Sequence, residues 1–280
     1  MYSTFGFGLI LFAFSSASTF GIASAPLIVT FILGLMIIAI FTFRQLRIKY
    51  PVLNIRVFKN KTFALSAVSS MLVYITMATP ALLIPMYIQT GLGLSALLSG
   101  IVVLPGAGCN GLIMVYTGKV FDKYGIKVLA IPGFILLIIM TFLYLFLTAD
   151  TPFWYVVVVY AIRMVALGLL IMPLNTVGLN ALESEDISHG TAIMNSLRII
   201  AGAMGTAISI TIFSIAAKSY TSTHHTMSKA KLIKVSTIHG VDVAFMFITV
   251  LIVIGTILAL FIKEERQRQS SNSDNQSENL

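Results

Sequence analysis

A few polar side chains lie in or near long apolar stretches of the chain, where a polar group is costly to bury. Arg163 stands about ten residues into one such stretch, which would place it roughly 15 Å deep in a membrane-spanning helix. Inserting an arginine at that depth costs at least about 2.5–3.5 kcal/mol, and intramembrane charges commonly mark a pathway. Arg163 therefore has two interpretations. It lines a transport or gating pathway, or it is a structural arginine that caps carbonyls of a broken neighbouring helix.

Arg198 lies only about six residues, or roughly 9 Å, into another apolar stretch. It can either extend to the membrane surface or face a polar pathway. Gln89, Asn175 and Asn195 are further polar groups in or near such stretches. Amides of this kind line pathways in some proteins, although they more often hydrogen-bond neighbouring helices. We take all these residues as transport-pathway candidates.

Composition predicts the setting of these residues. The chain is 58% hydrophobic and 10% charged, whereas an ordinary soluble domain is about 25% charged. Apolar runs of about 18 residues or more recur, and each can cross a hydrocarbon core of about 30 Å as a helix. The sequence therefore predicts an all-α polytopic membrane protein with about eight transmembrane helices. The expected spans are Phe5–Phe20, Ala25–Phe43, Phe63–Tyr87, Ala96–Tyr116, Val128–Leu147, Phe153–Leu179, Ala192–Ala216 and Val243–Ile262.

The spans divide the chain into four regions. Residues 1–43 should form a two-helix hairpin, and residues 63–263 a six-helix bundle. Between them, residues 44–62 mix cations with regularly spaced aliphatic residues, so we expect this linker to lie along the cytoplasmic interface. Residues 264–280 have almost no apolar side chains and should be a disordered cytoplasmic tail.

The net charge of +8 indicates membrane lipid rather than nucleic acid as the contact of the cations, because basic loops face anionic headgroups. Cytoplasmic loops carry an excess of lysine and arginine, and this predicts that both termini are cytoplasmic. A long outer loop over residues 218–240 is the exception. It would hold Lys218, Lys229, Lys231 and Lys234.

Several kinds of active site find no support. The sequence lacks the H-E-x-x-H, G-x-S-x-G and G-x-x-x-x-G-K-[ST] patterns of zinc proteases, esterases and ATPases. His224 and His225 are adjacent, which is a weak metal signal. We expect no enzyme activity, cofactor or metal. None of the expected spans contains aspartate or glutamate, so we also expect that the chain does not couple protons by itself.

Prolines interrupt several spans, among them Pro80, Pro85, Pro105, Pro132 and Pro173. Each removes a backbone donor, and the freed carbonyl needs a new partner. Such breaks suit helices that bend around a cavity, although small and helix-breaking residues also serve plain helix packing.

The stretch "TGKVFDKYGIK", residues 117–127, should form a charged cytoplasmic turn. Its pattern G-x-x-x-D-[KR]-x-G resembles the cytoplasmic signature loop of the major facilitator superfamily, with Gly118, Asp122, Lys123 and Gly125 on the signature positions. "RMVALG" is similar to a second signature of that superfamily, an arginine and then a glycine within a span. Arg163 and Gly168 occupy those positions.

The segments "PVLNIRVFKNKTF", "LIPMYIQTGLGLSALLSGIVVLPGA" and "HGTAIMNSLRIIAGAMGTAI" are similar to the C-terminal half of fourteen-span EmrB/QacA-type drug:proton antiporters. The resemblance covers nearly all of residues 1–263. It implies a multi-pass transporter of the cell membrane that exports small drug-like molecules against protons, with an N-terminal six-span half missing here.

The chain would then be the C-terminal portion of an efflux transporter and not competent alone. The alternative is a truncated, non-transporting membrane protein, or a half-transporter that pairs with a separate N-terminal half. Because the signature aspartate of such a transporter pairs across the two bundles, Asp122 should lack that partner, and either lie near the surface or pair locally.

Overall fold

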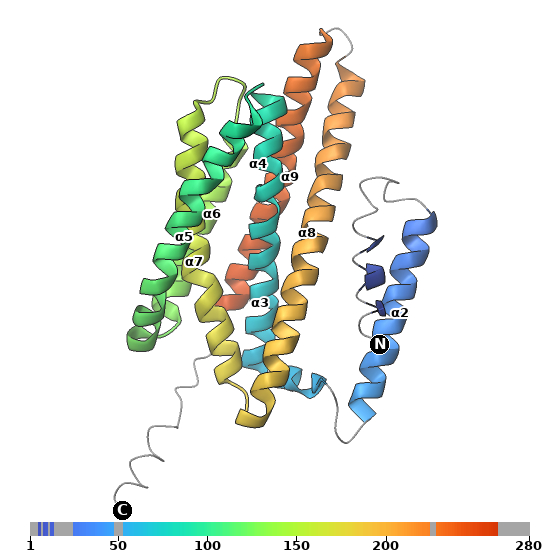
Figure 1. Cartoon of the computed structure of the whole chain (residues 1–280), viewed down its shortest axis with the longest axis vertical. Helices are drawn as coiled ribbons and strands as arrows, with labels where there is room; N and C mark the ends of the chain where they lie inside the picture. The colour runs from blue at the N-terminus through green and yellow to red at the C-terminus, as the bar shows by residue number, and fades with distance from the viewer. Residues whose placement is uncertain are drawn as a thin grey trace, which may run out of the picture.

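The computed structural model describes residues 5, 6, 8–10, 12, 13, 25–47, 53–224 and 228–262. These residues are helical apart from short turns, and seven helical stretches among them are long and apolar enough to cross a membrane. The predicted all-α polytopic fold is confirmed (Figure 1). The elements are α2 (Ala25–Arg47), η1 (Ile55–Lys59), α3 (Lys61–Ala78), α4 (Pro80–Met86), η2 (Tyr87–Gly91), α5 (Ala96–Tyr124), α6 (Lys127–Phe142), η3 (Leu143–Phe146), α7 (Phe153–Asn180), η4 (Ser184–Asp186), α8 (Ile187–Thr223) and α9 (Lys229–Leu260).

Helices α3 to α9 pack into one bundle, with α7 the most buried of the spans. Helix α7 lies against α3, α5 and α6, while α8 pairs with α9 and α3 touches both of them (Figure 1). The fully buried side chains of the core include Phe134, Leu167 and Phe245. Helices that are apolar all round can be buried in this way or face lipid, and α5 is mostly exposed in this chain.

The third expected span is broken into three pieces. Helix α3 ends at Ala78, α4 begins with Pro80 at its first position, and the π-helical turn η2 completes the crossing. Proline is tolerated at a first helical position, where the missing N–H costs least. Inside a continuous span, however, it leaves one carbonyl of the preceding turn without its backbone donor.

Two expected loops are mostly helix, so these expectations are wrong. Helix α8 continues to Thr223 and α9 starts at Lys229, which leaves little of the expected outer loop over residues 218–240. Helix α5 runs to Tyr124, so the turn in residues 117–127 is confined to Gly125 and Ile126. A run of apolar residues shows only the part of a helix that lies in hydrocarbon. The helix itself can extend into water, until a helix-breaking residue stops its backbone hydrogen bonds.

Gly125 ends α5 because its backbone has φ +78°, a conformation that L side chains rarely adopt. Its N–H donates to the carbonyl of Phe121 at 2.8 Å, which closes the last helical turn.

The linker between the hairpin and the bundle is tied to the end of α7. Asn60 donates its side-chain N–H to the carbonyl of Ala181 at 2.6 Å, and Asn54 donates to the carboxylate of Asp186 at 2.7 Å. These two amides hold η1 against the α7–α8 turn. The described part of the linker is therefore anchored to the bundle through polar contacts.

Other expectations fall wholly or partly outside the described residues. The tail 264–280 lies outside them, as does most of the first expected span. Where this span is described, Gly6 packs on Ile38 and Gly34 on Ile10. The four-region division, with its two-helix hairpin, stays a prediction.

Candidate substrate-facing site

Arg163 is fully buried in the middle of α7 and bonds to two neighbouring helices. Its Nε donates to the Oγ1 of Thr141 on α6 at 3.1 Å, and its Nη2 donates to the carbonyl of Thr76 on α3. Among the described side chains, none accepts a bond from its Nη1. The described residues also place no carboxylate in an ion pair with it.

The carbonyl of Thr76 has a specific reason to need Arg163. In a continuous helix it would accept from the N–H four residues later, which is the position of Pro80. Since Pro80 has no N–H, the guanidinium of Arg163 takes the place of that donor. These contacts match the structural interpretation of Arg163, an arginine that caps a carbonyl of a broken helix. A pathway role for it stays a prediction.

A second group of polar side chains crosses three helices. Ser70 and Tyr74 lie one turn apart on one face of α3. Ser70 donates its hydroxyl to the Oδ1 of Asn175 on α7 at 3.4 Å. Arg198 on α8 donates to the hydroxyl of Tyr74 at 3.4 Å, and its guanidinium lies 5.3 Å from the centre of that ring. The structure thus brings Asn175 and Arg198 to the same face of α3.

Asn195 extends this group. It is exposed on α8, three residues before Arg198, and residues at this spacing share a helix face. We call Ser70, Tyr74, Asn175, Asn195 and Arg198 the polar strip. Ser70 is buried, Tyr74 and Asn175 are half-buried, and the two α8 residues are exposed. An arginine that stacks on a tyrosine and stays accessible can contact an aromatic, anionic or carbonyl-bearing molecule.

Sequence reasoning missed Ser70 and Tyr74. Neither hydroxyl is unusual in a membrane helix, and only the adjacency of α3 to α7 and α8 shows their partners. The four-residue spacing along α3 was the one available signal.

Gln89 lies apart from the polar strip. It is exposed in η2, and its side-chain N–H donates to the hydroxyl of Ser99 in the first turn of α5 at 3.2 Å. It lies 19 residues beyond Ser70 along the α3–α4–η2 path, roughly 28 Å at 1.5 Å per residue. In this structure Gln89 links two helices at one end of the bundle.

Gly168 sits where α7 crosses α5 closely. A Cβ on Gly168 would come within 2.2 Å of the Cγ2 of Ile113. Beside it, the side-chain N–H of Asn110 donates to the carbonyl of Met164 at 2.8 Å. This glycine lets two helices approach, and its expected place on a pathway remains a prediction.

Three of the signature residues, Gly118, Asp122 and Lys123, lie on the last two turns of α5, and the fourth, Gly125, ends the helix. Gly118 faces Met172 of α7, whose Cε lies 3.2 Å from the place of a Cβ on that glycine. Asp122 and Lys123 are exposed, and in the described part of the chain no ion pair joins Asp122 to another residue. Asp122 therefore lies at the surface of this bundle, and its lack of a cross-bundle partner stays a prediction.

Asp242 adds to the expectation that no span contains an acidic residue. The expected span from Val243 has none, but α9 begins at Lys229, so Asp242 lies inside the same helix, directly before its most apolar stretch. The Oδ1 of Asp242 is buried and has no hydrogen-bond partner among the described residues. Helix α9 packs against η2, where the hydroxyl of Tyr87 donates to the carbonyl of Thr148 at 2.7 Å.

A pattern in the sequence could have found Asp242. The buried residues Ile238, Val241, Phe245 and Ile248 of α9 are spaced at three or four, so the buried face of the helix continues past the expected start at Val243. In the described ranges, no three histidine, cysteine or acidic side chains come together as a metal site.

Comparison with known proteins agrees with this helical bundle. Residues 1–206 match the Major Facilitator Superfamily. Over 263 residues the chain is 37% identical to the lincomycin resistance protein LmrB of Bacillus subtilis (strain 168), covering 93% of this chain and 55% of that protein. It is 36% identical over 264 residues to LmrB of Listeria innocua serovar 6a, covering 94% of this chain and 56% of that protein.

An uncharacterized MFS-type transporter of B. subtilis, YcnB, is 31% identical over 95% of this chain and 54% of its own length. The chain belongs to the major facilitator superfamily of membrane transporters. It spans just over half the length of these relatives.

Proposed function

We propose that this chain forms the C-terminal bundle of a proton-coupled multidrug exporter of the fourteen-span EmrB/QacA type, and that it works with a further six-span bundle. The observation that carries the proposal is the polar strip. It joins α3, α7 and α8 through Ser70–Asn175 and Tyr74–Arg198 contacts, and it ends in the exposed cation of Arg198.

In this arrangement the polar strip is part of the wall of a substrate pathway. Transporters of this kind place their sites between two bundles that rock against each other. Tyr74 and Arg198 offer an aromatic face and a cation. The exposed Asn195 adds an amide donor and acceptor. Such a wall suits drug-like molecules with both apolar and polar parts.

Lincosamide antibiotics are the first substrates to test, because the relatives with about 36% identity bear the name lincomycin resistance protein. Protons would drive export. Asp242, whose carboxylate is partly buried, is one group of this chain that could take part, and the other bundle would supply the rest.

The test joins this chain to the preceding half of B. subtilis LmrB and expresses the chimera in a lincomycin-sensitive host. We expect resistance and reduced accumulation of labelled lincomycin with the chimera, and neither with the 280 residues alone. Arg198→Ala should lower the resistance of the chimera at least about tenfold, as expected for the loss of roughly 1.4 kcal/mol of binding.

Lys231→Ala is the matched control, since Lys231 is an exposed cation on α9 outside the polar strip. It should leave resistance unchanged at equal protein levels. Proton-driven export by the 280 residues alone would contradict the two-bundle proposal. A well-expressed chimera that exports neither lincomycin nor a panel of cationic dyes would favour a non-transporting membrane protein instead.

A further inference from the structure

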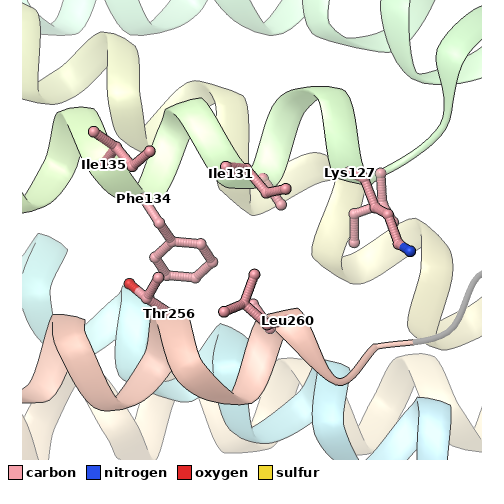
Figure 2. A pocket seen from close by; sticks show the side chains of 9 residues that line it. Lys127, Ile131, Phe134, Ile135, Thr256 and Leu260 are labelled. Carbon is pink, nitrogen blue, oxygen red and sulfur yellow. The ribbon is translucent and has the colours of Figure 1, made fainter.

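A groove of about 290 Å³ runs between α6 and α9, close to the end of the bundle where α5 turns into α6. Figure 2 shows Ile131, Phe134 and Ile135 on the α6 side, Thr256 and Leu260 on the α9 side, and Lys127 at one end. The volume is just below the range of about 300–1,000 Å³ that is typical of small-molecule pockets.

The walls of the groove belong to the lipid-facing surface. Ile131, Ile135 and Leu260 are 43%, 49% and 60% exposed, and their outer sides would contact hydrocarbon in a membrane. The floor is formed by the buried side chains of Phe134 and Ala130. The one hydroxyl of the lining, that of Thr256, donates to the carbonyl of Ile252 in its own helix. The interior therefore offers apolar surface.

The open end of the groove is cationic. Lys127 is exposed and is the first residue of α6, where the helix dipole adds partial positive charge. Lys119, Asp122 and Lys123 of α5 are also exposed at this end of the bundle, so its lysines outnumber the one carboxylate beside them. A phosphate at Lys127 would thus meet positive charge.

We propose that this groove binds one anionic phospholipid, with its phosphate at the ammonium of Lys127 and one acyl chain along α6 and α9. The distance from Lys127 to Ile135 is roughly 12 Å along the helix, long enough for a substantial part of an acyl chain. Basic pockets between transmembrane helices at a membrane face are a recurrent site for anionic headgroups. This site does not depend on the proposed transport function.

A tryptophan at the rim of the groove can report the bound lipid. The only native tryptophan, Trp154, lies at the start of α7, at the other end of α6. In a Trp154→Phe background, Leu260→Trp places the reporter on the groove. Ile135→Trp is the replacement if that variant folds poorly. The protein is reconstituted in phosphatidylcholine vesicles with increasing fractions of brominated phosphatidylglycerol or brominated phosphatidylcholine.

We expect brominated phosphatidylglycerol to quench the reporter with an apparent affinity about fivefold higher than that of brominated phosphatidylcholine. This factor corresponds to about 1 kcal/mol per cation at a membrane surface. Lys127→Gln should abolish the preference, so that the ratio of the two affinities falls to about one. Lys123→Gln removes the same charge from the same end but does not line the groove, so the preference should remain.

A second reporter separates the groove from the general surface. Val250→Trp lies on an exposed position of α9 that does not line the groove, and it should show no preference between the two lipids. Equal quenching by both lipids at Leu260→Trp would overturn the proposal. So would a preference that survives Lys127→Gln, or one that is just as strong at Val250→Trp.

Discussion

At the scale of single residues, Arg163 is a buried cation that pairs with no carboxylate of the described residues. Its Nε and Nη2 donate to the hydroxyl of Thr141 and to the carbonyl of Thr76, which Pro80 leaves without a helical donor. The break in α3 and the arginine in α7 are therefore two parts of one feature. Without Arg163 the buried carbonyl of Thr76 would lack a donor, and without that carbonyl the Nη2 of Arg163 would lack an acceptor. An unsatisfied buried polar group costs about 1–3 kcal/mol.

This pairing predicts a particular result in a double-mutant cycle. Arg163→Met should lower the free energy of unfolding in detergent by about 1.5–3 kcal/mol, the usual contribution of a hydrogen bond to a charged group. In a Pro80→Ala background, residue 80 can donate to Thr76 itself, so the same substitution should cost at least about 1 kcal/mol less. Chemical denaturation followed by circular dichroism measures all four proteins.

Arg198→Met is the matched control, because Arg198 is an exposed arginine on α8 whose contact is with Tyr74. It should change stability by less than about 1 kcal/mol in both backgrounds. Equal costs of Arg163→Met with and without Pro80 would show that the two positions are not coupled.

The sequence predicted the place of Arg163 but not its partners. Its depth follows from counting residues in one helix, which needs no tertiary structure. Its bond to Thr76 depends on α7 lying beside α3, and chain order alone does not predict which helices are neighbours. Asn175 and Arg198 are polar candidates by residue type alone. Ser70 and Tyr74 were missed because their partners depend on α3 lying beside α7 and α8, which chain order does not predict.

At the scale of elements, two glycines show that α5 and α7 cross closely. Gly168 faces Ile113 there, and a Cβ on Gly106 would meet the Tyr160 ring at 2.6 Å. Small residues allow helices in membranes to approach in this way, and dispersion contacts then supply the stability. The resemblance singled out Gly168 as a signature residue, and the structure gives it a packing role that spacing alone could not assign.

Gly168→Ala should therefore lower the free energy of unfolding by about 1–3 kcal/mol, the usual cost of overpacking. Gly108→Ala in the facing helix is its control, since nothing lies within 4 Å of a Cβ at Gly108. There, stability should be unchanged or rise by up to about 1 kcal/mol from helix propensity. Thermal unfolding in detergent compares the two proteins.

Shortening Ile113 offers a further check, because it makes room for the new methyl group. Ile113→Ala should cost less in the Gly168→Ala background than in the parent protein. If Gly168→Ala and Gly108→Ala proved equally harmless, the close crossing of α5 and α7 would not hold in the membrane.

The ends of helices were the least predictable elements. The limits of the expected spans were set where hydropathy falls. The lysines of α9 were therefore assigned to a loop, and Asp242 was left outside the span that starts at Val243. The helix nevertheless continues, because no proline interrupts residues 229–242 and Gly240, which lets Phe213 of α8 pack closely, is tolerated inside it. Conversely, the end of α5 at Gly125 follows from chemistry in the sequence, since a glycine can take the positive φ that closes the helix.

At the scale of the whole molecule, both ends of the bundle carry lysines. Lys119, Lys123 and Lys127 flank the turn between α5 and α6, and the α8–α9 connection, beside Lys218, Lys229, Lys231 and Lys234, lies at the opposite end (Figure 1). Three helices, α6, α7 and α8, separate these two turns in the chain, and an odd number of crossings places them on opposite faces of a membrane. Sequence alone predicted this alternation from the apolar spans. It could not predict which faces of α5 are covered, because that helix is apolar all round.

The cations of the linker region decide which end is predicted to be cytoplasmic. Arg56, Lys59 and Lys61 lie in η1 and at the start of α3, at the end opposite the α8–α9 connection, and add to the lysines beside the α5–α6 turn (Figure 1). By the positive-inside rule, this end should face the cytoplasm and the α8–α9 end should face outward. The chain contains one cysteine, Cys109, so Cys109→Ala gives a cysteine-free background for a topology test. Tyr124→Cys and Ser222→Cys then place single thiols at exposed positions, on the last residue of α5 and near the end of α8.

A membrane-impermeant maleimide applied to intact cells should label Ser222→Cys and leave Tyr124→Cys unlabelled until the cells are permeabilised. Labelling of Tyr124→Cys alone would show the opposite orientation, and the lysines at residues 218–234 would then follow the positive-inside rule while the α5–α6 turn broke it. Equal labelling of both thiols in intact cells would mean that the chain inserts in both directions.

Because the lysines of α8 and α9 weaken the charge bias, neutralising Lys119, Lys123 and Lys127 together should shift the labelling toward Tyr124→Cys. A labelling pattern that is unmoved by this change would show that other parts of the chain set the orientation.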